Sequence, residues 1–155
     1  TCRLRSWRGL EVSLDIVLID TSTWLLVLGK KVHVPQVKEK VEQLIKENRA
    51  AVTPMVSLEL LGGARSKDEF ARLKSRLDSL HQLAIGKKEW HQAAQLSFDL
   101  RRQGKTIPYS DILIATTAIQ ADAVLLHADR HFDIMAEMTG LTVDSLVHLV
   151  LKNTL

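Results

Sequence analysis

The chain has few cysteines and no long apolar runs, repeats or low-complexity tracts, so it has the composition of an ordinary globular protein. Only one of its 155 residues is a cysteine, Cys2, so a disulfide framework is excluded and a reducing, cytoplasmic compartment is expected. No apolar run approaches the about 18 residues of a membrane span, and Glu11 and Asp15 interrupt the start, so neither a membrane segment nor a secretory signal is predicted. Repeats, linkers and low-complexity tracts are also absent, which favours a single folded domain.

The chain also lacks a general excess of one charge. Arg3, Arg5 and Arg8 account for the whole formal net charge of +3, so the remainder is balanced. Any contact with nucleic acid must therefore come from a local patch. We interpret residues 1–13 as a cloning remnant, a mis-set start or a disordered leader, with a basic nucleic-acid-binding arm as the alternative, and residues 14–155 as the domain.

Short apolar runs alternate with helical patterns along the rest of the chain. Strands are predicted at 15–20, 50–53, 82–85, 123–126 and 141–143. Helices are predicted at 21–28, 35–48, 54–62, 67–80, 87–103, 108–120 and 130–138, and residues 145–155 suit either a strand or a helix. This alternation is typical of an α/β fold with a mainly parallel sheet, and we place Trp90 and Phe98 in its core.

Four acids stand where these elements end or turn. Asp20 ends the first predicted strand, and Asp129 follows the fourth. Glu59 lies in a helix with apolar neighbours that we expect to be largely buried, and Asp111 lies in the first turn of the helix that starts near Pro108. In a parallel sheet the ligand crevice lies outside the carboxyl ends of the strands, so all four acids would face one edge.

A cluster of this kind is costly without a partner. Each ionised carboxylate taken out of water costs several kcal/mol unless it is paired or bound to a metal. Oxygen ligands drawn from separate elements are the usual way to hold Mg²⁺, and Mn²⁺ is an alternative. Each acid also has a plainer interpretation, because Asp111 would complement a helix N-terminus and Asp129 would cap a helix. The combination is more specific than any member.

Four motifs in order, IVLIDTSTW, TPMVSLELLGGAR, IPYSDILIATTA and VLLHADRHFD, resemble the PIN-domain family. Within that family, the likeness is to the VapC-type ribonuclease toxins of bacterial toxin–antitoxin systems, over about residues 15–150. The resemblance implies a three-layer α/β/α sandwich with strand order 3-2-1-4-5. It also implies Mg²⁺- or Mn²⁺-dependent cleavage of RNA, an antitoxin partner and a homodimer.

The resemblance assigns the family's acidic quartet to Asp20, Glu59, Asp111 and Asp129. Asp20 and Asp111 are the expected direct metal ligands, Glu59 a ligand or an orienting group, and Asp129 the residue that completes the site. The hydroxyl neighbours Thr21, Ser22 and Ser110 fit the pattern as accessory residues. The chain departs from the family at His127, where Thr or Ser is common, and at His131, where another acid is frequent.

Further residues are assigned weaker roles. His127 and His131 would bind metal or protonate a leaving group, but a position at the surface or behind the ligands is the plainer interpretation. Asp133 would replace a missing ligand or cap a helix. The basic cluster of Arg101, Arg102 and Lys105 would contact RNA phosphates or form a solvated helix end. Tyr109 would stack on a base or pack at its helix start, and surplus apolar groups around Trp24, Leu25 and Leu28 would suit a partner helix.

Three other functions compete with the ribonuclease toxin. A phosphoryl-accepting domain is disfavoured, because the Asp-x-Asp of haloacid-dehalogenase-type phosphatases is replaced by Asp20-Thr21-Ser22, and the acid pair and lysine of a receiver are missing. A PIN-like interaction module with impaired catalysis is supported by the two histidine departures. A PIN nuclease of RNA processing, rather than a toxin, would share the same residues.

Overall fold

A computed structural model describes residues 3–5, 11–13, 15–29 and 32–153, so Cys2 and Arg8 lie outside the described residues. Within these ranges the main sheet has five parallel strands in the order β5-β4-β3-β6-β7. The strands are β3 Val17–Ile19, β4 Ala50–Val52, β5 His81–Gln82, β6 Val124–His127 and β7 Val143–Ser145. The predicted strand order 3-2-1-4-5 is confirmed.

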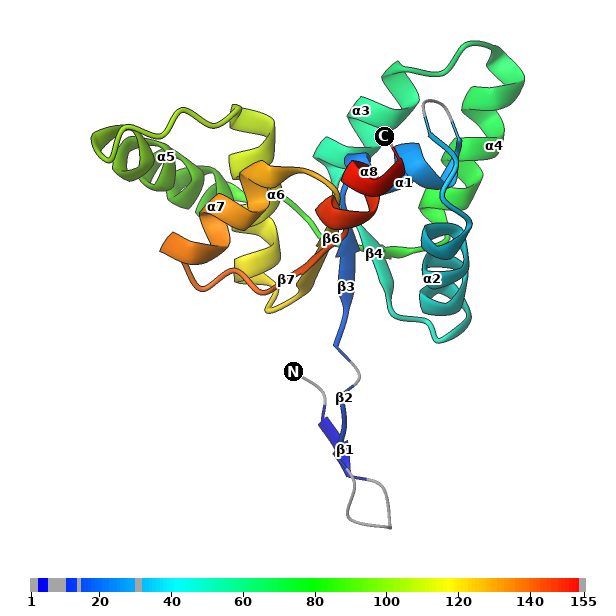
Figure 1. The fold of residues 1–155 in the computed structure, drawn as a ribbon, viewed down its shortest axis with the longest axis horizontal. Helices are drawn as coiled ribbons and strands as arrows, with labels where there is room; N and C mark the ends of the chain where they lie inside the picture. The colour runs from blue at the N-terminus through cyan, green and yellow to red at the C-terminus, as the bar shows by residue number, and fades with distance from the viewer. Residues whose placement is uncertain (1–2, 6–10, 14, 30–31, 154–155) are drawn as a thin grey trace.

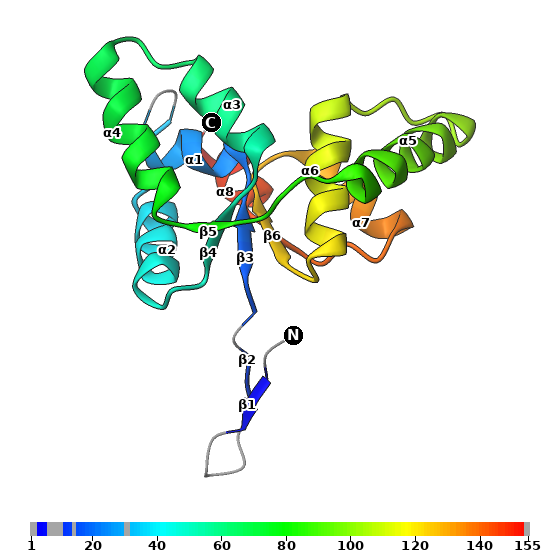
Figure 2. The same ribbon diagram turned by 180° about the vertical axis from the view of Figure 1, so that it is seen from behind.

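Helices cover both sides of this sheet, as Figures 1 and 2 show. The helices are α1 Thr21–Val27, α2 Pro35–Lys46, α3 Pro54–Gly62, α4 Lys67–Asp78, α5 Lys87–Arg102, α6 Tyr109–Gln120, α7 Arg130–Met138 and α8 Val147–Asn153. Helices α1, α2 and α4 lie to one side of the sheet, and α5, α6 and α7 lie to the other. In the described part of the chain, no helix is both long and apolar enough to cross a membrane.

The central strands are buried on both faces, which explains their unbroken apolar runs. All three residues of β3 and all three of β4 are buried, and Trp24 and Phe132 are among the largest fully buried side chains. Several helices begin with the residue types that their sequences indicate: Asp20 caps α1, Ser66 caps α4, and proline opens α2 and α3. The main sheet is therefore held rigidly at its centre.

Two strands before the main sheet form a separate antiparallel pair. Strand β1 Arg3–Arg5 pairs with β2 Glu11–Ser13, with Arg3 opposite Ser13. In Figure 1 this pair extends away from the sheet, below β3. The interpretation of residues 1–13 as a leader stays a prediction.

The structure corrects several expectations. Trp90 and Phe98 were expected in the core, but their exposed fractions are 58% and 57%. They are exposed because α5 packs through a narrow face, on which only Ala93 and Leu100 are buried. The third and fifth strands also lie at 81–82 and 143–145 rather than at 82–85 and 141–143. Of the two alternatives for the tail, strand or helix, residues 147–153 form the helix.

Candidate active site

Two neighbouring strands bring Asp20 and Asp129 to one edge of the sheet. Asp20 directly follows β3, and Asp129 follows β6 by two residues. The strands are parallel, with Val17 opposite Val124, so their carboxyl ends meet at the same edge. Each acid also caps the next helix, because Asp20 accepts a hydrogen bond from the Ser22 backbone N–H and Asp129 accepts one from the His131 backbone N–H. Capping and a place at the site are therefore compatible for both.

The Asp20 carboxylate is buried and only half satisfied. Only 3% of the surface of Asp20 is exposed. Oδ2 accepts hydrogen bonds from the Ser22 backbone N–H at 2.9 Å and from Ser22 Oγ at 2.6 Å. Oδ1 is also buried, and no described residue donates a hydrogen bond to it. A buried carboxylate oxygen without a donor is the arrangement that a bound cation would satisfy.

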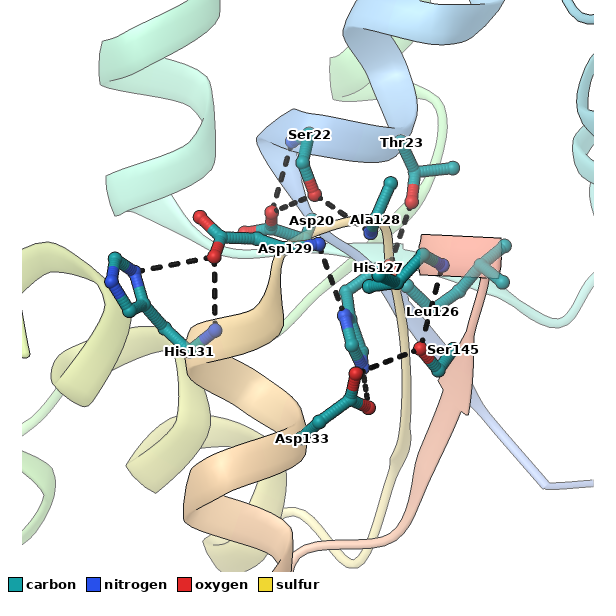
Figure 3. A network of polar contacts seen from close by, with 11 residues as sticks. Asp20, Ser22, Thr23, Leu126, His127, Ala128, Asp129, His131, Asp133 and Ser145 are labelled. Atoms are coloured by element: carbon teal, nitrogen blue, oxygen red, sulfur yellow. Dashed lines mark hydrogen bonds and ion pairs between the residues drawn. The ribbon is translucent and has the colours of Figure 1, made fainter. Parts of the chain in front are cut away.

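Ser22 joins the segments that carry the two acids (Figure 3). While its Oγ donates to Asp20, it accepts a hydrogen bond of 2.9 Å from the Ala128 backbone N–H. Thr23 adds a second link, because its Oγ1 donates to the Leu126 carbonyl oxygen at 3.0 Å. Sequence reasoning placed Ser22 beside Asp20 but missed the link to Ala128, because nothing local in the sequence signals a contact between residues 106 positions apart.

His131 lies between two of the acids. Its Nδ1 is 2.8 Å from Asp111 Oδ2 and 3.2 Å from Asp129 Oδ1. Among the described residues, Asp111, Asp129 and His131 form a group whose possible ligand atoms all lie within 4.8 Å of one another. Adjacent ligands of an octahedral cation are about 3 Å apart, given metal–ligand distances near 2.1 Å. The separations in this group fit a divalent cation.

Glu59 stands at the rim of the site rather than in the core. The helix α3 was expected to be largely buried, but Val56 and Leu60 are its buried residues, Leu58 is 66% exposed and Glu59 is exposed as well. Thr21 Oγ1 donates a hydrogen bond of 3.1 Å to Glu59 Oε1. This bond orients Glu59 toward the start of α1, next to Asp20.

The pKa values of Asp20, Glu59 and Asp111 are all raised, in each case partly by the charge of a neighbouring acid. Burial raises the pKa of Asp20 to about 6, the hydrogen bonds from Ser22 oppose this rise, and the charge of Glu59 adds to it. Partial loss of water around Glu59 at the rim raises its pKa; the hydrogen bond from Thr21 opposes this rise, and the charge of Asp111 adds to it. Burial also raises the pKa of Asp111; His131 lowers it by its hydrogen bond, and the charges of Asp129 and Asp20 raise it. The four acids therefore share one field of mutual repulsion, which a cation would relieve.

His127 is a buried support, not a surface residue. Its exposed fraction is 0%, and its Nδ1 accepts a hydrogen bond of 3.2 Å from the Asp129 backbone N–H. Burial lowers its pKa, which favours the neutral ring, while the nearby charges of Asp133 and Asp129 oppose this effect. Of the two plainer positions suggested from the sequence, the surface is wrong, because the strand β6 carries His127 into the core; His127 lies behind Asp129 instead.

Asp133 turns toward His127 (Figure 3). Its Oδ1 lies 3.2 Å from His127 Nε2, without a well-aligned hydrogen bond, and its Oδ2 accepts a hydrogen bond of 3.1 Å from Ser145 Oγ. Asp129, rather than Asp133, caps α7. Asp133 therefore contacts His127, and His127 in turn accepts the hydrogen bond from the Asp129 backbone. The link of Asp133 to the acids is indirect.

The remaining expected site residues flank this centre. Ser110 is half-buried in the first turn of α6, directly before Asp111. The exposed basic cluster at the end of α5 is divided between two surfaces. Arg101 lines a cleft beside His131, whereas Arg102 lines a separate cavity with Met138 and Thr139. Lys105 is exposed in the connection that follows α5.

Known proteins share this sequence pattern and this fold. The PIN domain model matches residues 17–138. Ribonuclease VapC11 of Mycobacterium tuberculosis is 30% identical over 134 residues, covering 84% of this chain and 98% of the relative. Ribonuclease VapC51 of the same organism is 31% identical over 126 residues, covering 79% of this chain and 87% of the relative.

A solved structure gives the same result for the fold. The VapBC2 complex of Rickettsia felis, bound to a DNA fragment from its promoter, contains a chain that superposes with a TM-score of 0.70. That chain is 23% identical, and the match covers 84% of this chain and 98% of that chain. By sequence match and by fold, the chain belongs to the PIN domain family and, within it, groups with the VapC ribonucleases.

Proposed function

We propose that this protein is a divalent-cation-dependent endoribonuclease and the toxin of a VapBC-type toxin–antitoxin system. The observation that carries the proposal is the Asp111–Asp129–His131 group beside the unsatisfied buried oxygen of Asp20. These groups lie at the carboxyl edge of a parallel sheet, where such folds bind ligands. The relatives named VapC ribonucleases support RNA as the substrate, and a cytoplasmic place of action belongs to the same proposal.

The side chains divide the work of the site. Asp20, Asp111 and Asp129 would hold Mg²⁺ or Mn²⁺, with His131 as a nitrogen ligand beside them. Glu59, oriented by Thr21, would hold the cation or align the attacking water. Once bound, the cation would polarise the scissile phosphate and lower the pKa of that water.

The supporting residues fix these side chains before RNA arrives. Ser22 holds one oxygen of Asp20 and leaves the other free, and it ties the segment after β3 to the segment after β6. His127 fixes the backbone of Asp129 by accepting a hydrogen bond from its N–H. Because these supports are buried or half-buried, they hold the acid side chains in position before the reaction. The acids therefore lose little conformational entropy when RNA and the cation bind. The expected products are a 5′-phosphate and a 3′-hydroxyl.

A cleft between α1 and α4 suits the antitoxin. It has a volume of about 300 Å³ and is lined by Leu28, Glu69, Arg72, Leu73 and Arg76. Its leucines and arginines would accept a partner helix with an apolar face and acidic flanks. The VapBC complex among the similar structures supports an antitoxin as the partner, and we further propose that the toxin forms a homodimer.

The decisive test is cleavage of total RNA and of purified tRNA with and without Mg²⁺ or Mn²⁺. Wild-type protein should cut only with the cation, and Asp20→Asn should lower the rate more than about a hundredfold, since it removes a ligand rather than a ligand's support. Asp99→Asn makes the same chemical change on the exposed face of α5 and should cut at the wild-type rate. An Asp20→Asn protein that cuts as fast as the wild type would remove the basis of the proposal.

A catalytically impaired PIN module is the second candidate function. The observation that favours it is the imidazole of His131 between Asp111 and Asp129, whose Nδ1 already contacts an oxygen of each carboxylate. Under this alternative, no cation and no RNA would restore cleavage in the wild type, but His131→Asp would. Growth arrest on expression without an antitoxin separates a toxin from a PIN nuclease of RNA processing.

A further inference from the structure

A cleft opens beside the acids and shares a residue with them. Its volume is about 370 Å³, and it is lined by Arg101, Thr106, Ile107, Pro108, Tyr109 and His131. His131 also lies against Asp111 and Asp129. The cleft and the acids are therefore neighbouring parts of one surface, so a chain bound at the acids would extend into the cleft or start from it.

Tyr109 presents an aromatic ring at this cleft. It is the first residue of α6, two positions before Asp111, and 67% of it is exposed. The ring is held in place by Arg101, whose Nη2 donates a hydrogen bond of 2.8 Å to the Tyr109 hydroxyl. The guanidinium carbon lies 5.6 Å from the ring centroid. An exposed ring that is fixed in position loses little entropy when a flat ligand binds to it.

Arg101 retains donors for a second contact. A guanidinium has five N–H donors, and the bond to Tyr109 uses one of them. The charge is always present, and its planar donors match a phosphate group. A stacking ring and a phosphate-binding cation side by side are the two elements with which proteins bind single-stranded nucleic acid.

We propose that Tyr109 and Arg101 form a nucleotide subsite next to the cleavage site. The Tyr109 ring stacks on an unpaired RNA base, and Arg101 binds a phosphate of the same stretch. This inference rests on the proposed ribonuclease function and narrows its substrate class to RNA that is single-stranded at the cut, because a base inside a duplex has no free face to offer. Tyr109 lies two residues before Asp111 and lines the same cleft as His131, so the stacked base would lie beside the acids.

The chain contains a matched control pair. Arg102 lies over the ring of Phe98 with its guanidinium carbon 5.7 Å from the centroid, and Phe98 is 57% exposed. Arg102 lines a different cavity of about 570 Å³, which His131 does not line. The two pairs have the same kind of chemistry, but only the Tyr109 pair adjoins the acids. The basic cluster therefore contributes Arg101, not Arg102, to this subsite.

The test measures RNA binding with cleavage switched off. Fluorescence anisotropy in EDTA would follow a labelled single-stranded RNA of random sequence binding to the full chain. Tyr109→Ala should weaken binding about five- to 150-fold, the range of a lost base–aromatic stack. Tyr109→Phe keeps the ring and loses only the hydrogen bond to Arg101, so it should weaken binding far less than Tyr109→Ala does. Arg101→Gln should lower the slope of log K against log salt by about 0.7, the share of one phosphate on a single strand. Phe98→Ala and Arg102→Gln should change neither quantity.

A strand without bases makes the assignment specific. On a ribose-phosphate chain of equal length, Tyr109→Ala should bind as the wild type does, while Arg101→Gln should still lose its part of the salt slope. The proposal is overturned if Tyr109→Ala binds normal RNA like the wild type, if it loses as much on the baseless strand, or if Phe98→Ala loses equally. Wild-type protein that neither binds RNA in EDTA nor cuts it with Mg²⁺ or Mn²⁺ contradicts both the ribonuclease function and this subsite. If the wild type cuts RNA but Tyr109→Ala and Tyr109→Phe bind RNA equally well, the subsite alone is contradicted.

Discussion

Replacing Asp20 by Asn tests whether its buried charge is kept for a cation. The residue is 3% exposed, and Oδ1 has no hydrogen-bond donor among the described residues. Burial raises its pKa from 3.8 to about 6. In the absence of a cation the charged carboxylate is therefore a burden on the fold, and the neutral amide of Asn removes that burden.

The magnitude follows from the shift in pKa. A rise from 3.8 to about 6 corresponds to about 3 kcal/mol, at 1.36 kcal/mol for each pKa unit. The folded protein binds the proton more tightly than the unfolded chain, so the group's contribution to stability is complete below about pH 4. It is lost as the pH rises through about 6. Above pH 7 the wild type without metal should be less stable by this amount than if Asp20 were neutral.

The free energy of unfolding of Asp20→Asn, compared with that of the wild type, should therefore depend on pH. Its carbonyl oxygen can still accept the hydrogen bonds from Ser22. Its buried amide N–H groups would cost about 1–3 kcal/mol if they found no acceptor, but this cost does not vary with pH. In EDTA, the free energy of unfolding of Asp20→Asn minus that of the wild type should therefore increase by about 3 kcal/mol between pH 4 and pH 8.

Urea unfolding followed by tryptophan fluorescence measures this difference. The Asp99→Asn variant, with the same substitution at an exposed position, should show a far smaller change with pH. Saturating Mn²⁺ at pH 8 should stabilise the wild type clearly more than Asp20→Asn, because the variant keeps the Asp111, Asp129 and His131 ligands but lacks the Asp20 carboxylate. A pH-independent difference in EDTA, or equal stabilisation of both proteins by Mn²⁺, would refute the reasoning.

Three further predictions concern neighbouring residues. Imidazole is a poorer ligand for Mg²⁺ than a carboxylate is, so His131→Asp should tighten Mg²⁺ binding about tenfold in isothermal titration calorimetry, and unchanged affinity would exclude His131 from the site. Ser22→Ala removes the bonds to Asp20 and to the Ala128 N–H, and we expect it to lower the free energy of unfolding in urea by about 1–3 kcal/mol; a loss well below this range would contradict the link. Arg72→Glu in the α1–α4 cleft should prevent co-purification of the antitoxin and leave RNA cleavage at the wild-type rate, and retained co-purification would place the antitoxin elsewhere.

The sequence was informative where a segment has only one way to be buried. The run before Asp20 is apolar without alternation, which suits a strand covered on both faces, and β3 is such a strand. Its polar end then had to lie at the sheet edge. The order of the strands came from the family resemblance, and the sheet has that order.

The sequence was less informative where apolar residues have two possible environments. Helix α3 is apolar nearly all round, so its buried face could not be read from periodicity, and Leu58 and Glu59 proved to be exposed. Trp90 and Phe98 failed as core predictions for the related reason that an apolar side chain is not obliged to be buried.

Contacts within the site were the least predictable part. The hydrogen bond between Ser22 and the Ala128 N–H joins segments 106 residues apart, and the contact of His131 with Asp111 spans 20 residues. Both depend on how β6 and α7 sit beside α1 and α6. No local pattern encodes that arrangement, so the sequence could suggest the acids, Ser22 and His127 as residues of the site but not the contacts that join them.

The central claim is that acids from four separate elements form one cation site at the sheet edge. Anomalous diffraction from crystals soaked in Mn²⁺ tests it most directly. The account predicts a strong peak at about 2.1–2.3 Å from oxygens of Asp111 and Asp129, with Asp20 facing the same ion. A peak elsewhere on the molecule, or no peak at saturating Mn²⁺, would contradict it.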